Sequence, residues 1–313
     1  MRIGILCPGQ GAQQVGMGSE LRREFPQARL CFDEADEALG FSLSRLCAEG
    51  PEDRLTDTRN AQPALLVHAV AVARVLADEQ GLRPVIGAGH SLGEWSALVG
   101  AGVIGLADGL RAVQARGRFM AEAAGAGQGG MTALLGVEPD VVAELCRDAT
   151  IGEELVVPAN FNGGGQIAVA GHVSALGRLE AAAQARRIRS TRLRVSAPFH
   201  SPFMAPAAER MRAVVAQLEL RDPAFPIVSN VDAAPHARGE IFRRLLVEQI
   251  TQPVRWQECA ARVAEACDLA LEIGPGRVLA GLMRRIAREF ACRSLGEPAE
   301  IRAWLGEGRE AMA

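Results

Sequence analysis

Lysine and tyrosine are both absent from the 313 residues, so all 34 basic side chains are arginines. Without lysine the chain cannot form a Schiff base through a side-chain amine. A phosphate-binding loop of the Gly-Lys-Ser/Thr type is excluded for the same reason. The absence of tyrosine removes another common acid–base group. General base chemistry is therefore expected from one of the five histidines.

Charge, cysteine use and hydropathy narrow the class of protein further. The formal net charge is −3, which disfavours a general nucleic-acid binder. The seven cysteines are scattered and form no C-x-x-C pair, which indicates reduced thiols rather than disulfides or a metal site. The sequence has no uninterrupted apolar run of 18 residues, and Pro8 and Gly9 end the first short run. We expect a cytoplasmic monomer with no nucleic-acid or membrane partner.

Short apolar runs alternating with helical patterns predict a parallel α/β domain formed by residues 1–125 and 198–313. The expected elements of this part are strand 3–6, helices 19–38 and 63–80, strand 85–88, helix 94–101, strand 226–230, helices 240–250 and 256–266, strand 269–273 and helix 279–290.

Residues 126–197 are predicted to form a separate, smaller unit that follows a Gly/Ala-rich hinge at 125–130. Their order of strand, helix, two strands, helix and strand is the ferredoxin-like βαββαβ arrangement. The expected elements are strand 132–137, helix 139–149, strands 155–160 and 166–170, helix 173–186 and strand 190–196. A cleft is expected between the two units, near the carboxyl ends of the parallel strands.

The segment Gly89-His90-Ser91-Leu92-Gly93 has the G-x-S-x-G pattern of a nucleophile elbow. It lies between a predicted strand and a predicted helix, which is the context in which this pattern has meaning. Small residues at both ends allow a strained turn that exposes the Ser91 hydroxyl. The backbone N–H of Leu92 would then point at a developing oxyanion.

A serine hydroxyl needs a base, and His200 is the best placed of the five histidines. It lies where the chain leaves the small unit and rejoins the large one, and so at the expected cleft. His68 lies in an apolar helix, and His90 adjoins Ser91 in a tight turn from which neighbouring side chains point apart. The two others, His172 and His236, fall in predicted loops.

Five stretches together resemble the malonyl-CoA:acyl-carrier-protein transacylase family of fatty acid and polyketide synthesis. They occur in the family's order and are Pro8-Gly9-Gln10-Gly11-Ala12-Gln13, Gly89-His90-Ser91-Leu92-Gly93-Glu94, Arg116-Gly117-Arg118-Phe119-Met120, Phe199-His200-Ser201-Pro202-Phe203-Met204 and Gln249-Ile250-Thr251-Gln252-Pro253-Val254-Arg255-Trp256. The similarity extends from about residue 3 to about residue 290. It implies an α/β-hydrolase-like domain with an inserted ferredoxin-like subdomain.

The resemblance also implies roles for individual residues. Ser91 resembles the nucleophile that carries the acyl ester, and His200 the general base. The backbone carbonyl of Gln249 would orient His200, in place of an Asp. The N–H groups of Gln10 and Leu92 would form the oxyanion hole. Arg116 would bind the malonyl carboxylate, and Phe199 and Met120 would line the acyl pocket.

The implied reaction moves a malonyl group from malonyl-CoA to the phosphopantetheine thiol of an acyl carrier protein, with ping-pong kinetics and no metal or redox cofactor. The bulk of Phe199 and the identity of Leu92 favour malonyl over methylmalonyl. Trp95 departs from the commoner Phe or Tyr. The acidic carrier would need a basic surface. Candidates are Arg186, Arg187, Arg189, Arg192 and Arg194 on the insert, and Arg284, Arg285 and Arg288 near the end.

Other functions remain open at the level of sequence. One is a trans-acting acyltransferase of a polyketide synthase with another acyl specificity. A second is an acyl hydrolase acting on carrier proteins, which the presence of Arg116 disfavours. A third is an ordinary esterase, which would use a Ser…Asp/Glu…His order and usually an HGGG-type loop. The last is a binding subunit in which Ser91, His200 and Arg116 have no catalytic role.

Overall fold

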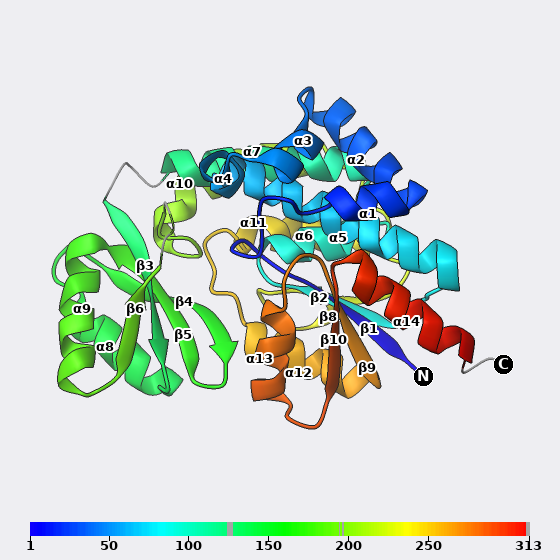
Figure 1. Cartoon of the computed structure of the whole chain (residues 1–313). Helices are drawn as coiled ribbons and strands as arrows, with labels where there is room; N and C mark the ends of the chain where they lie inside the picture. Colours follow the sequence, from blue (N-terminus) through cyan, green and yellow to red (C-terminus); the bar gives the residue numbers. More distant parts are fainter. Residues whose placement is uncertain (124–127, 194, 196, 311–313) are drawn as a thin grey trace.

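The computed structural model describes residues 1–123, 128–193, 195 and 197–310, and in it the chain forms two sheets with helices around them (Figure 1). The larger, six-stranded sheet has the order β10-β9-β1-β2-β7-β8. All of its pairs are parallel except β7–β8. Its strands are β1 (Ile3–Cys7), β2 (Ile86–Gly89), β7 (Ile227–Val228), β8 (Pro235–His236), β9 (Leu269–Ile273) and β10 (Ala291–Leu295).

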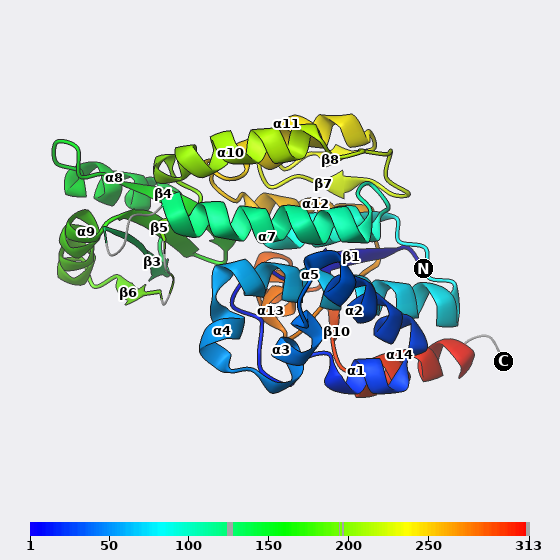
Figure 2. The same cartoon turned by 90° about the horizontal axis from the view of Figure 1, so that it is seen from above.

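Helices cover both faces of this sheet (Figures 1 and 2). On one face lie α1 (Ser19–Glu24), α2 (Pro26–Leu39), α3 (Leu43–Glu49), α4 (Glu52–Thr56), α5 (Thr58–Gln80), α6 (Leu92–Gly100), α7 (Leu106–Ala123) and α10 (Ala205–Ala216). On the other lie α12 (Trp256–Ala266) and α13 (Val278–Ile286). The remaining helices are the 3-10 turns Pro202–Met204 and Gly239–Ile241, α11 (Phe242–Glu248) and α14 (Pro298–Glu310).

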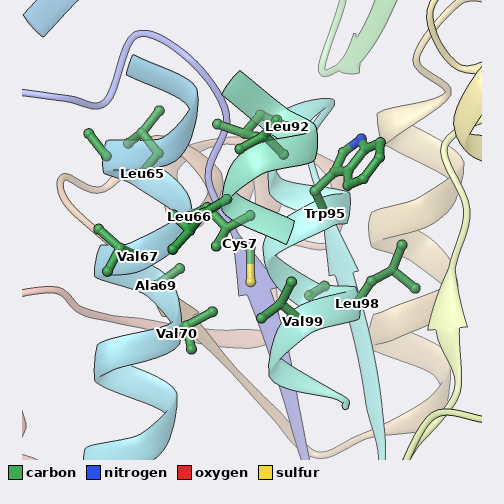
Figure 3. Packing of buried hydrophobic residues seen from close by; sticks show 14 of the residues in the cluster. Cys7, Leu65, Leu66, Val67, Ala69, Val70, Leu92, Trp95, Leu98 and Val99 are labelled. Carbon is green, nitrogen blue, oxygen red and sulfur yellow. The ribbon is translucent and has the colours of Figure 1, made fainter. Parts of the chain in front are cut away.

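Strand β1 shows why two separate cores form. Successive side chains of a strand point to opposite faces. Ile5 and Cys7 therefore pack in the core under α5 and α6, whereas Leu6 packs in the core under α12 and α13. Figure 3 shows part of the first of these cores, where Cys7 lies between the side chains of α5 and α6 and Trp95 points to the side of α6 away from α5.

Helix α5 is buried on nearly every side, because other helices pack on it as well as the sheet. By length and composition alone it could cross a membrane, but 78% of its most apolar 18-residue window is buried inside the protein. It is the one such helix in the described part of the chain. This burial accounts for its all-round apolar sequence as a core helix.

The smaller sheet is antiparallel, with the order β4-β5-β3-β6. Its elements are β3 (Gly129–Leu135), α8 (Pro139–Ala149), β4 (Val156–Gly163), β5 (Gln166–His172), α9 (Val173–Ala185) and β6 (Arg189–Arg192). One face packs on α8 and α9 through its own core, which includes Leu134 and Val169. Together with the larger parallel sheet, this βαββαβ unit confirms the predicted fold class.

Several predicted elements differ in extent from those observed. The predicted helix 19–38 is two helices, because Phe25 is extended and Pro26 starts the second one. The predicted helix 279–290 ends at Ile286, and the predicted strand 190–196 ends at Arg192. Residues 240–250 begin with a 3-10 turn. Helices α3, α4, α7, α10 and α14 and strands β8 and β10 were not among the predicted elements. The predicted hinge at 125–130 and Arg194 fall partly or wholly outside the described residues.

Candidate active site

Ser91 occupies the sharp turn between β2 and α6, with φ 52° and ψ −105°. A non-glycine residue rarely adopts such a backbone conformation, and the flanking glycines make it possible. A Cβ atom at Gly89 would lie 1.9 Å from the Gly93 carbonyl carbon, and one at Gly93 would lie 2.0 Å from the Cys7 carbonyl oxygen. Both positions therefore require glycine, and the turn has the geometry expected of a nucleophile elbow.

His200 lies directly opposite the Ser91 hydroxyl, 109 residues away in the sequence. Its Nε2 is 2.7 Å from Ser91 Oγ, and its Nδ1 is 2.8 Å from the backbone carbonyl oxygen of Gln249. A carbonyl only accepts, so Nδ1 carries the proton and donates it, which leaves Nε2 free to accept from serine. Burial, followed by the positive charge of Arg116, lowers the pKa of His200 to about 3. The imidazole is therefore neutral at pH 7.

Arg116 reaches the same point from helix α7 and is only 1% exposed. Its Nη2 donates to Ser91 Oγ at 3.1 Å and to Gln249 Oε1 at 3.0 Å, while Nη1 donates to Gln62 Oε1 at 2.8 Å. Burial lowers the pKa of Arg116 to about 10, and the Glu94 carboxylate opposes this shift. The guanidinium remains charged at pH 7, and a charged guanidinium beside Ser91 can bind an anionic group there.

A second set of polar side chains holds the elbow from behind. Asn230 accepts the Ser91 N–H at 2.7 Å and donates from Nδ2 to the Gly89 carbonyl at 2.7 Å. Glu94 accepts the Asn230 N–H at 3.0 Å and the Gln249 Nε2–H at 2.6 Å. Sequence reasoning gave no role to Asn230, Glu94 or Gln62. The position of Asn230 at the end of a predicted strand is a signal that could have found it; none points to Gln62.

Gln10 and Leu92 line the same cleft as Ser91. The two parallel strands that end there place the Gln10 loop beside the elbow, since Cys7 pairs with Gly89. Leu92 is the first residue of α6, where backbone N–H groups lack partners within the helix. Its side chain is buried in the core (Figure 3). The Gln10 side chain lies within 2.7 Å of Thr58 Oγ1, which anchors the loop.

A cleft of about 430 Å³ opens onto Ser91 between the two sheets. One wall carries the Gln10 loop, Arg116 and helix α13, and the other carries Met131, Ala168 and Val195. The predicted acyl-pocket residues Phe199 and Met120 both line it and are nearly buried. Its lining combines apolar side chains with a few polar groups, as in many small-molecule sites.

The other histidines and Trp95 do not contact the Ser91 hydroxyl. His90 points away from it, and its Nε2 lies 2.8 Å from Asn162 Oδ1 on β4. His172 accepts a hydrogen bond from the Leu155 N–H through Nδ1. The Nε2 of His236 lies 3.0 Å from Asp232 Oδ2. Neither ring nitrogen of His68 has a hydrogen-bond partner within the described residues. Trp95 is fully buried in the core, outside the residues that line the cleft.

Comparison with known proteins places this geometry in a family. Residues 5–301 match the family model described as an acyl transferase domain. The malonyl CoA-acyl carrier protein transacylase of Salmonella typhimurium is 41% identical over 306 residues, which cover 97% of this chain and 99% of that protein. The chain belongs to the malonyl-CoA:acyl carrier protein transacylase family. This result confirms the resemblance predicted from the five motifs.

Other transacylases of the family agree in sequence and in structure. The Bacillus subtilis protein of the same name is 40% identical over 302 residues, covering 96% of this chain and 95% of its own. The solved transacylase from Xanthomonas oryzae is 43% identical, with a TM-score of 0.94 over 98% of this chain and 99% of that one. A type II PKS acyl-carrier protein in complex with its malonyl-transacylase has the same TM-score, with 38% identity over 98% of this chain and 100% of that one.

Proposed function

We propose that this protein transfers a malonyl group from malonyl-CoA to the phosphopantetheine thiol of an acyl carrier protein through an ester on Ser91. One observation carries the proposal. Ser91 Oγ lies between a neutral imidazole nitrogen at 2.7 Å and a buried guanidinium at 3.1 Å. A base and a carboxylate-binding group at one hydroxyl suit a nucleophile that receives an acyl group with a free carboxylate.

In the first half-reaction the Ser91 hydroxyl attacks the thioester carbonyl of malonyl-CoA. His200 Nε2 takes the hydroxyl proton as the C–O bond forms, and its protonated Nδ1 stays bonded to the Gln249 carbonyl. The N–H groups of Leu92 and Gln10 stabilise the oxyanion. Collapse of the tetrahedral intermediate breaks the C–S bond, and the proton on His200 passes to the departing CoA thiolate.

In the second half-reaction the carrier thiol replaces CoA in the same cleft. His200 takes the thiol proton, the sulfur attacks the Ser91 ester, and collapse of the intermediate returns the proton to Ser91 Oγ. Atoms balance without a metal or a redox cofactor. CoA leaves before the carrier reacts. Double-reciprocal plots of the initial rate against malonyl-CoA concentration, at several fixed carrier concentrations, should therefore be parallel lines, as for ping-pong kinetics.

The Arg116 guanidinium fixes the acyl chain in both half-reactions. Its terminal nitrogens Nη1 and Nη2 can bind the malonyl carboxylate bidentately when the carboxylate replaces Ser91 Oγ as acceptor of one Nη2 hydrogen. The bound acyl group excludes water from the line of attack on the ester. Phe199 and Met120 limit the space beside the acyl α-carbon, which favours malonyl over methylmalonyl. These features support transfer over the alternative in which the protein hydrolyses carrier-bound acyl groups.

The carrier protein is expected to dock on a basic surface. Arg187, Arg189 and Arg192 line a groove at the edge of the small sheet. Arg192 is paired with Glu180, whereas Arg187 and Arg189 have no ion-pair partner among the described residues. Arg285, from the second predicted group, lines the cleft itself. We propose that the groove attracts the acidic carrier and that Arg285 acts near the cleft mouth.

Three further proposals concern the chain as a whole. Residues 1–125 with 198–313 form the large subdomain and 126–197 the small one, so that the cleft lies at their junction. The location is cytoplasmic, in keeping with seven free thiols of which six are buried. The active form is a monomer, since one chain supplies every group that the mechanism uses.

Intact-mass measurement after incubation with malonyl-, methylmalonyl- or acetyl-CoA tests the reaction. A malonyl adduct on the wild type that is absent from Ser91→Ala, and that moves to added carrier protein, supports the proposal. An adduct that is lost to water at the same rate with and without carrier would favour the hydrolase. Malonyl transfer by Ser91→Ala would contradict the proposed nucleophile and favour a binding subunit.

A further inference from the structure

Glu94 is a fully buried carboxylate to which the mechanism above gives no role. It lies in the first turn of α6, three residues after the nucleophile. Its Oε2 accepts the Gln249 Nε2–H at 2.6 Å and the Asn230 N–H at 3.0 Å, while Oε1 has no partner among the described residues. Burial raises the pKa of Glu94 to about 7, and the hydrogen bonds from Asn230 and Gln249 and the charge of Arg116 oppose this rise. Glu94 is therefore largely ionised only above pH 7, because burying a carboxylate is costly unless nearby groups compensate its charge. The positive charge nearest in this network is that of Arg116, which Glu94 reaches through Gln249.

A single amide connects Glu94 to the Arg116 guanidinium. Gln249 Nε2 donates to Glu94, and Gln249 Oε1 accepts from Arg116 Nη2 at 3.0 Å. A guanidinium only donates and an ionised carboxylate only accepts, so the amide can satisfy both in one orientation only. Flipping it would set its NH₂ group against the guanidinium and its oxygen against the carboxylate. Glu94, together with the Ser91 carbonyl oxygen that also accepts from Gln249 Nε2 at 3.0 Å, therefore sets which end of Gln249 faces Arg116.

The same amide keeps the two charges apart. No carboxylate in the described part of the chain lies within ion-pair distance of Arg116. The charge of Glu94 nevertheless favours the protonated, charged form of Arg116, because electrostatic interactions are strong in the low-dielectric interior. A carboxylate in direct contact would occupy the guanidinium donors that an acyl carboxylate needs. A counter-charge one amide away compensates the buried cation without itself contacting the guanidinium, on which Gln249 occupies one Nη2 hydrogen and Gln62 one Nη1 hydrogen.

We propose that Glu94 is a positioning residue for the acyl carboxylate: through the Gln249 amide it orients and charge-balances Arg116 without occupying its donors. The inference rests on the proposed function, because it assumes that Arg116 binds the malonyl carboxylate. A purely structural role, in which Glu94 only holds the Asn230 N–H and the start of α6, would affect every thioester alike. Dependence on the substrate carboxylate separates the two roles.

The test compares acylation by malonyl-CoA and by acetyl-CoA, which has the same thioester but no free carboxylate. Single-turnover formation of the acyl-enzyme is followed by intact mass, and the ratio of kcat/KM for the two substrates is the readout. Glu94→Gln keeps the size of the side chain and removes the charge. It should lower the malonyl-to-acetyl ratio about tenfold, in the direction of Arg116→Ala. Glu94→Asp, which keeps the charge, should recover part of the ratio.

Glu272→Gln is the matched control, because Glu272 is the other fully buried glutamate described. It accepts the Leu279 and Ala280 N–H groups at 2.8 and 2.9 Å and does not contact Arg116 or Gln249. It should lower thermal stability without changing the malonyl-to-acetyl ratio. A Glu94→Gln variant that loses both acylation rates by the same factor would overturn the inference.

Gln249→Glu provides a second variant that keeps Glu94 in place. It puts a carboxylate next to Arg116, and its backbone carbonyl still holds His200. It should lower the malonyl-to-acetyl ratio, and an unchanged ratio would overturn the inference even if Glu94→Gln does not fold. Acylation of the wild-type protein separates a failure of the proposed function from a failure of the role of Glu94. Absence of a malonyl ester on wild-type Ser91 refutes the proposed function, whereas normal wild-type acylation with unaffected ratios refutes only the role of Glu94.

Discussion

Arg116 Nη2 lies 3.1 Å from Ser91 Oγ, although Ser91 is in the turn before α6 and Arg116 is in α7, 25 residues further along the chain. The contact places a positive charge at the hydroxyl oxygen that would become the ester oxygen in the proposed reaction. It also leaves the neutral His200 as the proton acceptor on the other side. The Arg116 guanidinium and the His200 imidazole therefore contact the same Ser91 hydroxyl, and substitutions can separate their contributions.

Removing the guanidinium should act on substrates that carry a carboxylate. We expect Arg116→Ala to lower kcat/KM for malonyl-CoA by about 10- to 100-fold, the effect of losing hydrogen bonds to a charged group. Acetyl-CoA should be affected much less. Arg111→Ala, on the same helix and 57% exposed, is the control and should change neither. Equal losses for both thioesters would show that Arg116 supports the elbow rather than the acyl carboxylate.

Phe199 should control the size of the acyl group. Its side chain lines the cleft beside Ser91. Phe199→Ala opens space for a methyl branch, so the ratio of kcat/KM for methylmalonyl-CoA to that for malonyl-CoA should rise about tenfold. Phe203→Ala removes a similar ring that packs on His172 outside the cleft lining and should leave the ratio unchanged. No change for Phe199→Ala would assign the selectivity to another residue.

The glycine at the base of the elbow should tolerate no side chain. Gly93→Ala would force Cβ to within 2.0 Å of the Cys7 carbonyl oxygen, so we expect at least about 3 kcal/mol of destabilisation and loss of acylation. Gly100→Ala, at the other end of α6, meets nothing within 4 Å and should be neutral or stabilising by ~0.5–1 kcal/mol. Chemical denaturation measures both. A Gly93→Ala variant of normal stability would contradict the steric argument.

The burial of His200 should make stability depend on pH. Its pKa is lowered from 6.5 to about 3 in the folded protein, so between these values the unfolded chain binds more protons. His200 therefore contributes stability above pH 6.5 that is lost as the pH falls towards 3. His200→Gln should make the fall in unfolding free energy shallower in this window, by up to ~1.4 kcal/mol per pH unit. Equal slopes for the two proteins would refute the buried neutral imidazole.

Carrier docking should depend on the groove beside β6. Replacing Arg187 and Arg189 by Glu should raise the KM for the carrier protein several-fold, because the carrier is acidic, and the effect should weaken at high salt. The CoA half-reaction, read as the malonyl-enzyme burst, should not change. Arg45→Glu is the control on α3, with 75% of its side chain exposed. A normal KM for the double variant would place docking elsewhere, with Arg285 the next candidate.

Local patterns in the sequence are enough to predict much of the chemistry. The pattern Gly-His-Ser-Leu-Gly between strand and helix predicts the elbow, because the steric need for small residues is local. The order of apolar periodicities likewise predicts the parallel sheet and the βαββαβ insert. His200 could be selected without coordinates, since no lysine is available and its position follows the end of the insert. Helix ends were less predictable: Pro26 breaks a helix whose apolar pattern continues across it.

Tertiary structure alone decided how the remaining groups combine. Arg116 looks like a surface arginine in its own helix, and only the packing of α7 against α5 buries it beside Ser91. Gln249 serves twice: the family resemblance implies the role of its backbone carbonyl, whereas no pattern in the sequence indicates the role of its side-chain amide. The Glu94 carboxylate acquires its relation to Arg116 through that amide. Such relations depend on distances between segments far apart in the chain, which local patterns do not encode.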